Sequence, residues 1–152
     1  MPCQAPFDMP LDTGSAAEFC IASTPMAVRD ALRDILGHPL MAQLPQDARG
    51  TVELVLAEAL NNIVEHAYDR DDGPIGLRLQ RQPNRLLCHV CDAGAPMPNR
   101  QLPQGSAQPI GANTVLAEGG YGWFLIRALA ENLVYRRIEA RNHLSFQLNI
   151  EQ

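Results

Sequence analysis

The sequence predicts an α+β fold, a two-layer sandwich in which helices cover one face of a mostly antiparallel sheet. Apolar residues repeat at helical spacing over residues 25–36, 45–68 and 118–131. Short alternating segments predict two hairpins, at residues 75–92 and 133–150. The resulting order of helix, helix, hairpin, loop, helix and hairpin is typical of a sheet with its helices gathered on one side.

Local signals justify the limits of the first two helices. The first has a hydroxyl cap and a proline in its first turn at residues 23–25, and Gly37 and Pro39 end it. Pro45 introduces a second, longer helix that we expect to run to about Tyr68.

The strands are expected where apolar and β-branched residues are bounded by polar turns. A first strand is predicted at residues 18–22. Two further pairs are predicted, one at residues 75–81 and 86–92, the other at residues 133–140 and 144–150 around a turn at 141–143.

A long segment without regular structure is expected at residues 94–119. It contains several prolines and glycines and few large apolar residues. A loop of that length in a compact domain is normally a lid, a binding loop or a disordered insert.

Length and charge suit one acidic domain. The chain has 152 residues, 46% of them apolar, and a formal net charge of -5. Lys and Arg are scattered, which argues against a nucleic-acid surface. Neither a membrane span nor a secretory signal is present in the sequence, so we expect a cytoplasmic location. The predicted division is a mobile N-terminal segment, residues 1–15, and a single domain, residues 16–152.

The cysteine pair Cys88 and Cys91 has the spacing of a C-x-x-C motif but lies in a predicted strand. Side chains alternate along a strand, so the two thiols are expected on opposite faces. They are also too far apart along an extended chain for a disulfide. We therefore predict two small core residues and neither a metal nor a redox site.

Three polar residues, Glu58, Asn62 and His66, recur at four-residue spacing in the second helix, so they share one helix face. They flank an apolar stripe that faces the core, so they are expected at the rim of a cleft. A carboxylate there can act as a general base, and an amide oxygen is a ligand suited to Mg²⁺. The alternative for each residue alone is a satisfied or solvated polar side chain.

A second candidate is Asp92, which an apolar strand delivers to the edge of the sheet, followed by Gly94. A carboxylate there can accept a hydrogen bond from an amino group such as that of adenine, and the glycine allows a ligand close to the backbone. An ordinary turn at a strand end is the alternative.

A third candidate is the run of Gly119, Gly120 and Gly122 at the start of the third helix. Backbone N–H groups at a helix N-terminus bind anions, and glycines let phosphate oxygens approach them. A hinge that closes the loop onto its helix is the alternative. Neither a P-loop nor a complete Rossmann fingerprint is present.

The three candidates follow, in chain order, the pattern E-x-x-x-N-x-x-x-H-A, D-x-G-x-P and, after a long loop, G-G-x-G before a helix. This order resembles the GHKL ATPase superfamily, whose Bergerat fold is shared by histidine-kinase catalytic domains, gyrase B and MutL. The resemblance spans residues 24–150. The length and the run GGYGWFLIRALAENLVYRR look most like the anti-sigma-factor serine-protein kinases, which bind a sigma factor and phosphorylate an anti-anti-sigma (STAS) partner.

The resemblance implies a role for each candidate residue, with ATP and Mg²⁺ as cofactors. Glu58 matches the acid that orients or deprotonates the attacking hydroxyl, and Asn62 matches the Mg²⁺ ligand. Asp92 matches the acid that binds the adenine amino group. Gly94 lies beside that acid, the glycines at 119, 120 and 122 lie at the phosphates, and residues 94–119 form the ATP lid. No chemical role is assigned to His66.

Two further positions bear on the resemblance. Phe124 stands where many members have another glycine, which puts catalysis more in doubt than nucleotide binding. Ser145 is expected where the superfamily often has an adenine-pocket hydroxyl.

The leading hypothesis is therefore an ATP-dependent protein serine/threonine kinase of the anti-sigma type, with a sigma factor and a STAS protein as partners. A non-catalytic module that sequesters its partner is the alternative, and the catalytic half of a histidine kinase is a third. Whether the chain forms a homodimer is left open.

Overall fold

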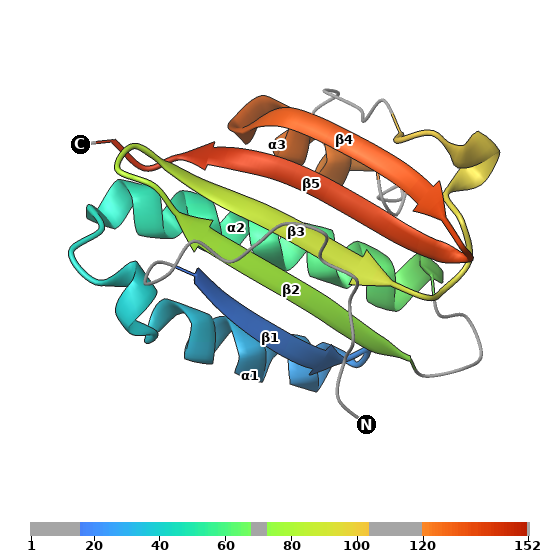
Figure 1. The fold of residues 1–152 in the computed structure, drawn as a ribbon, viewed down its shortest axis with the longest axis horizontal. Coiled ribbons are helices and arrows are strands. Elements are labelled where there is room, and N and C mark those ends of the chain that lie inside the picture. Colours follow the sequence, from blue (N-terminus) through green and yellow to red (C-terminus); the bar gives the residue numbers. More distant parts are fainter. Residues whose placement is uncertain (1–15, 68–72, 104–119, 152) are drawn as a thin grey trace, which may run out of the picture.

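The computed structural model describes residues 16–67, 73–103 and 120–151. Five antiparallel strands form one sheet in the order β1-β2-β3-β5-β4, and the three α-helices cover one of its faces (Figure 1). The predicted α+β sandwich is confirmed. In chain order the elements are β1 Ala16–Ala22, α1 Pro25–Leu36, η1 Pro39–Met41, α2 Gln46–Asn62, η2 Ile63–Ala67, β2 Pro74–Arg81, β3 Arg85–Asp92, η3 Pro98–Arg100, α3 Gly120–Leu129, β4 Ala130–Ile138 and β5 Arg141–Asn149.

Helix α1 begins and ends at the predicted residues. The Thr24 hydroxyl accepts a hydrogen bond of 3.1 Å from the Ala27 N–H, and Pro25 occupies the first turn. At the other end, the Gly37 N–H donates to the Arg33 carbonyl.

Helix α2 is shorter than predicted, because the helical chain changes its hydrogen-bonding pattern at Ile63. Residues 63–67 form a π-helix, η2, instead of a further α-helical turn. The Ala67 carbonyl at its end accepts a 2.8 Å hydrogen bond from the Ala95 N–H in the loop after β3. π-Helical turns of this kind are frequent at functional sites.

The hairpin of β2 and β3 is confirmed, with Ile75 opposite Asp92 and Leu79 opposite Cys88. The predicted turn of the last hairpin is wrong. The turn consists of Glu139 and Ala140, with φ of 50° and 62°, and β5 already begins at Arg141. Two-residue turns with positive φ favour Asn-Gly or Asp-Gly pairs, so the Glu-Ala pair gave no turn signal.

The core lies between the sheet and the helices. Alternate strand residues point into it, among them Cys88 and Val90 of β3 and Leu144, Phe146 and Leu148 of β5. Cys91 lies on the opposite face of the sheet, as predicted, and Cys20, Cys88 and Cys91 are free thiols. Burial raises the pKa of the Cys88 thiol, so this thiol stays protonated and unreactive.

No helix within the described ranges is both long and apolar enough to cross a membrane. The predicted N-terminal segment, residues 1–15, lies outside the described residues, as do residues 68–72 between η2 and β2 and residues 104–119 of the predicted lid.

Candidate functional site

Helices α2 and α3 meet at three of the predicted site residues. Gly122, in the first turn of α3, lies against Glu58 and Asn62 of α2. A Cβ atom at position 122 would stand 2.5 Å from Glu58 Oε2 and 3.7 Å from Asn62 Nδ2. A glycine is therefore required for this arrangement of the two helices with the Glu58 carboxylate in its present position.

Asn62 is buried, with 7% of its surface exposed, and its Nδ2 makes no hydrogen bond to the described residues. A buried donor without a partner costs about 1–3 kcal/mol. Such a group beside a carboxylate and a glycine indicates a ligand-binding site, because a bound molecule would supply the missing partner.

Glu58 is half-buried on the same face of α2. Burial raises the pKa of its carboxyl group, and the negative charge of Glu65 raises it further. A carboxyl group whose pKa is moved towards neutrality suits a general base. His66, the third residue of the predicted face, is exposed, and its Nε2 lies 3.6 Å from the Glu65 carboxylate.

Asp92 ends β3 and has only 5% of its surface exposed. Its Oδ1 accepts two hydrogen bonds of 2.8 Å, from the Gly94 N–H and from Asn142 Nδ2. No described residue donates to Oδ2, which leaves that oxygen for a ligand. Burial raises the pKa of Asp92, while these two hydrogen bonds and the positive charge of Arg137 lower it.

Asn142 is the site residue that sequence reasoning missed. It was expected in a turn, but it lies in β5 directly opposite Asp92. A shorter turn between the last two strands would have located it, because a two-residue turn before Arg141 places position 142 in the strand. Ser145, expected at the adenine pocket, lies on the opposite face of the sheet from Asp92 and Asn142, because side chains alternate along β5.

Gly94 makes a close approach to the protein's own backbone. A Cβ atom there would overlap the carbonyl group and the Cβ of Ala67 at the end of η2. Because η2 continues α2 directly after Asn62, this contact places the loop after Asp92 against the same end of α2 that carries Asn62. The carboxylate of Asp92 and the pair of Glu58 and Asn62 are thus anchored to one helical segment.

The predicted glycine run is described in part. Gly119 lies outside the described residues, and Gly120 begins α3. Of the predicted lid, residues 94–103 are described, and the Arg127 side chain in α3 donates hydrogen bonds to the carbonyls of Pro103 (2.8 Å) and Leu102 (3.4 Å).

The donor set fits a magnesium nucleotide. The described residues contain no cluster of three or more His, Cys, Asp or Glu side chains that could hold a metal. Mg²⁺ bound together with phosphates needs no such cluster, because one or two protein oxygens suffice. Asn62, whose Nδ2 lies beside Gly122, carries one such oxygen at the other end of its amide.

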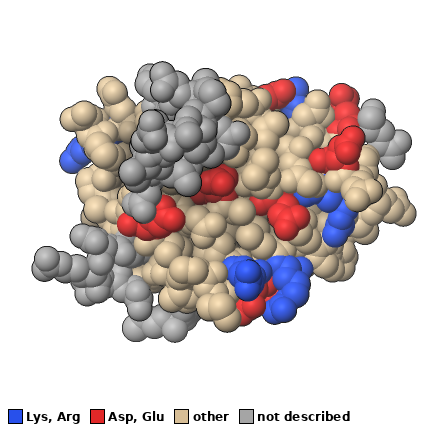
Figure 2. Space-filling model, turned by 180° about the vertical axis from the view of Figure 1, so that it is seen from behind, with Lys and Arg blue, Asp and Glu red and all other residues tan. Residues whose placement is uncertain are grey.

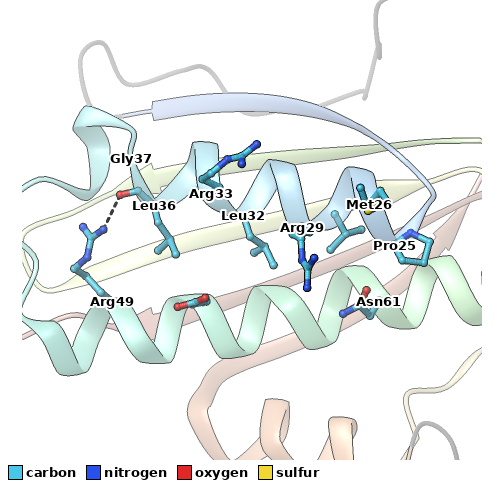
Figure 3. Close-up of a pocket in the computed structure, with 11 residues that line it drawn as sticks. Pro25, Met26, Arg29, Leu32, Arg33, Leu36, Gly37, Arg49 and Asn61 are labelled. Atoms are coloured by element: carbon cyan, nitrogen blue, oxygen red, sulfur yellow. Dashed lines mark hydrogen bonds between the residues drawn. The ribbon is translucent and has the colours of Figure 1, made fainter.

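A separate groove of about 870 Å³ lies between α1 and α2 (Figure 3). Met26, Leu32 and Leu36 line it together with Arg29 and Arg33. It contains none of the predicted site residues. On the helix-bearing side of the molecule, acidic and basic side chains are interspersed (Figure 2).

The chain is similar to known proteins over much of its length. Residues 21–148 match the family described as the histidine kinase-like ATPase domain. The chain is 32% identical over 87 residues to the serine-protein kinase RsbW of Bacillus pumilus, covering 54% of each chain. It is 33% identical over 99 residues to the serine/threonine-protein kinase BtrW of Bordetella bronchiseptica, covering 64% of this chain and 68% of that protein.

The fold also resembles that of a blue-light activated histidine kinase from Erythrobacter litoralis EL346. The TM-score is 0.52 at 22% identity, over 81% of this chain and 39% of the other. This likeness concerns the fold alone.

The chain therefore belongs to the histidine kinase-like ATPase domain family, which confirms the superfamily expected from the sequence. Its relatives include proteins named serine-protein kinases. The chain spans about half the length of the RsbW relative that it matches.

Proposed function

We propose that the chain is an ATP-binding anti-sigma regulator that acts as a protein serine/threonine kinase. Its substrate would be an anti-anti-sigma protein with a STAS domain, and its second partner a sigma factor. The family supports ATP use, and the relatives named serine-protein kinases support transfer to a hydroxyl group. A cytoplasmic location belongs to the same proposal.

The observation that carries the proposal is the meeting of Glu58, Asn62 and Gly122. A carboxylate with a raised pKa, a buried amide whose Nδ2 has no partner among the described residues, and the first turn of a helix lie side by side there. Phosphoryl transfer depends on positioning and charge stabilisation, so few protein groups are needed.

Each residue would then have one task. Glu58 would accept the proton of the attacking serine or threonine hydroxyl, Asn62 would hold Mg²⁺, and Asp92 Oδ2 would accept a hydrogen bond from the adenine amino group. The N–H groups at the start of α3 bind phosphate oxygens. When bound, Mg·ATP supplies the transferable phosphoryl group and the charge that neutralises its oxygens.

The test is transfer of label from radiolabelled ATP to a purified STAS-domain protein. Glu58→Ala should lower the transfer rate by about 100-fold or more, because a positioned general base contributes about that factor. Glu53→Ala, an exposed glutamate on the same helix, is the matched control and should keep the wild-type rate. Equal transfer by wild type and Glu58→Ala, or none by wild type, would reject the kinase.

A non-catalytic module that sequesters its partner is the second candidate. Phe124 favours it, because a bulky ring stands in the second turn of α3 where many members have a glycine. Calorimetry that finds tight binding of the partner without nucleotide, together with no label transfer, would select this function instead.

A further inference from the structure

Asn142 uses both ends of its amide within the network around Asp92. Its Nδ2 donates to Asp92 Oδ1 and to the Ala95 carbonyl, each at 2.8 Å. Its Oδ1 accepts from Arg137 Nη1 at 3.0 Å and from the Tyr135 hydroxyl at 2.5 Å. A guanidinium can only donate and a carbonyl can only accept, so the orientation of the amide is fixed.

The two side chains that hold Asn142 also hold the loop that follows Asp92. Arg137 Nη1 donates to the Gly94 carbonyl at 2.7 Å, and the Tyr135 hydroxyl accepts from the Met97 N–H at 3.0 Å. Asn142 thus lies at the centre of a connection between the β4–β5 hairpin, the carboxylate and residues 94–97.

We propose that Asn142 is a positioning residue, which holds Asp92 by Oδ1 so that Oδ2 faces the amino group of adenine. This inference rests on the proposed nucleotide function of the site. Asn142 acts through Asp92. Its hydrogen bonds to Tyr135 and Arg137 hold the carboxylate at a fixed position relative to the backbone of residues 94–97.

The physical reason is that Asp92 is buried and carries a charge. Two hydrogen bonds to Oδ1 fix the plane of the carboxylate, and losing one frees it to rotate. Burial raises the pKa of Asp92. The Asn142 amide lowers it again, together with the Gly94 N–H and the charges of Arg137 and His143. Without the amide, that pKa rises.

The experiment measures the dissociation constants of ATP and ITP for the full chain by calorimetry over a series of pH values. ITP carries an oxygen where ATP carries the amino group that Asp92 binds. The variants are Asn142→Ala and, as the matched control, Asn149→Ala, an exposed asparagine on the same strand. Thermal unfolding and circular dichroism report whether each variant folds.

Asn142→Ala should weaken ATP binding about tenfold, the factor expected for one hydrogen bond to a charged group. It should lower the preference for ATP over ITP, and the pH at which ATP binding is half lost on the acid side should move upward. Asn149→Ala should change none of these.

Equal weakening of ATP and ITP, with no shift in the pH midpoint, would overturn the positioning role and leave a merely structural one. If Asn142→Ala fails to fold, Tyr135→Phe provides the test, because it removes the hydroxyl that donates to Asn142 Oδ1. This variant should also lower the preference for ATP over ITP and raise the pH midpoint of ATP binding. An unchanged preference and midpoint in that variant would reject the proposal. Wild-type protein that binds neither nucleotide at any pH would instead reject the proposed function.

Discussion

Replacing Gly122 with alanine tests the contact between α2 and α3. The added Cβ would stand 2.5 Å from Glu58 Oε2, and Cβ atoms in proteins rarely come closer than about 3.0 Å to another atom, so the carboxylate must retreat by about 0.5 Å or rotate away. The atom that must move is the far end of a flexible, half-buried side chain, so the fold can accommodate the change.

The magnitudes separate stability from function. Alanine favours a helix over glycine by about 1 kcal/mol, and a strained rotamer of Glu58 costs about 0.5–1.5 kcal/mol. The two effects nearly cancel, so the free energy of unfolding should change by less than about 1 kcal/mol. Misplacing a reacting group by a fraction of an ångström to 1 Å costs about 10- to 100-fold in rate, and we expect that loss in phosphoryl transfer to a STAS-domain substrate.

The assay combines chemical denaturation with transfer of label from ATP. Gly50→Ala is the control, because Gly50 lies in α2 with nothing within 4 Å of its added Cβ. That variant should gain about 0.5–1 kcal/mol of stability and keep its activity. Wild-type transfer by Gly122→Ala would refute the inference that this contact belongs to the active site.

Two other predictions follow from buried polar groups. Asn62→Leu should raise the free energy of unfolding by up to about 1 kcal/mol, because it removes a buried donor that has no partner among the described residues, and should abolish the effect of Mg²⁺ on ATP binding. A loss of stability in denaturation would contradict this. Burial and the charges of His143 and Arg78 lower the pKa of His89 from 6.5 to about 4. The unfolded chain therefore binds more protons between these values, and stability should fall as pH drops through that window. Because His89 is partly exposed, the loss in the free energy of unfolding is limited to the order of 1 kcal/mol. His89→Gln should show a flatter dependence in denaturation curves than wild type, whereas an identical dependence would show that His89 does not cause it.

The sequence predicted the groups of the site better than the contacts between them. Periodicity placed Glu58 and Asn62 on one helix face, and the apolar run of β3 placed Asp92 at the end of that strand, since both are local properties of the chain. The meeting of Gly122 with Glu58 is a long-range contact that no local pattern encodes.

Two positions show why the remaining contacts could not be predicted. Asn142 was missed because the Glu-Ala turn before it adopts a backbone conformation that its residues do not favour. Gly94 was expected to admit a ligand, but the close approach seen there is made by Ala67, whose position depends on the π-helical end of α2. A contact of Gly94 with nucleotide remains a prediction.

ATP binding measured with and without Mg²⁺ tests most directly whether the end of α2 holds a magnesium nucleotide. Wild-type protein should bind ATP at least about tenfold more tightly with Mg²⁺, the factor that corresponds to about 1.4 kcal/mol. Asn62→Ala should bind equally with and without the metal. A metal effect that persists unchanged in Asn62→Ala would contradict the role of Asn62 as the Mg²⁺ ligand. A wild-type protein that binds no ATP under either condition would contradict a nucleotide site in this protein.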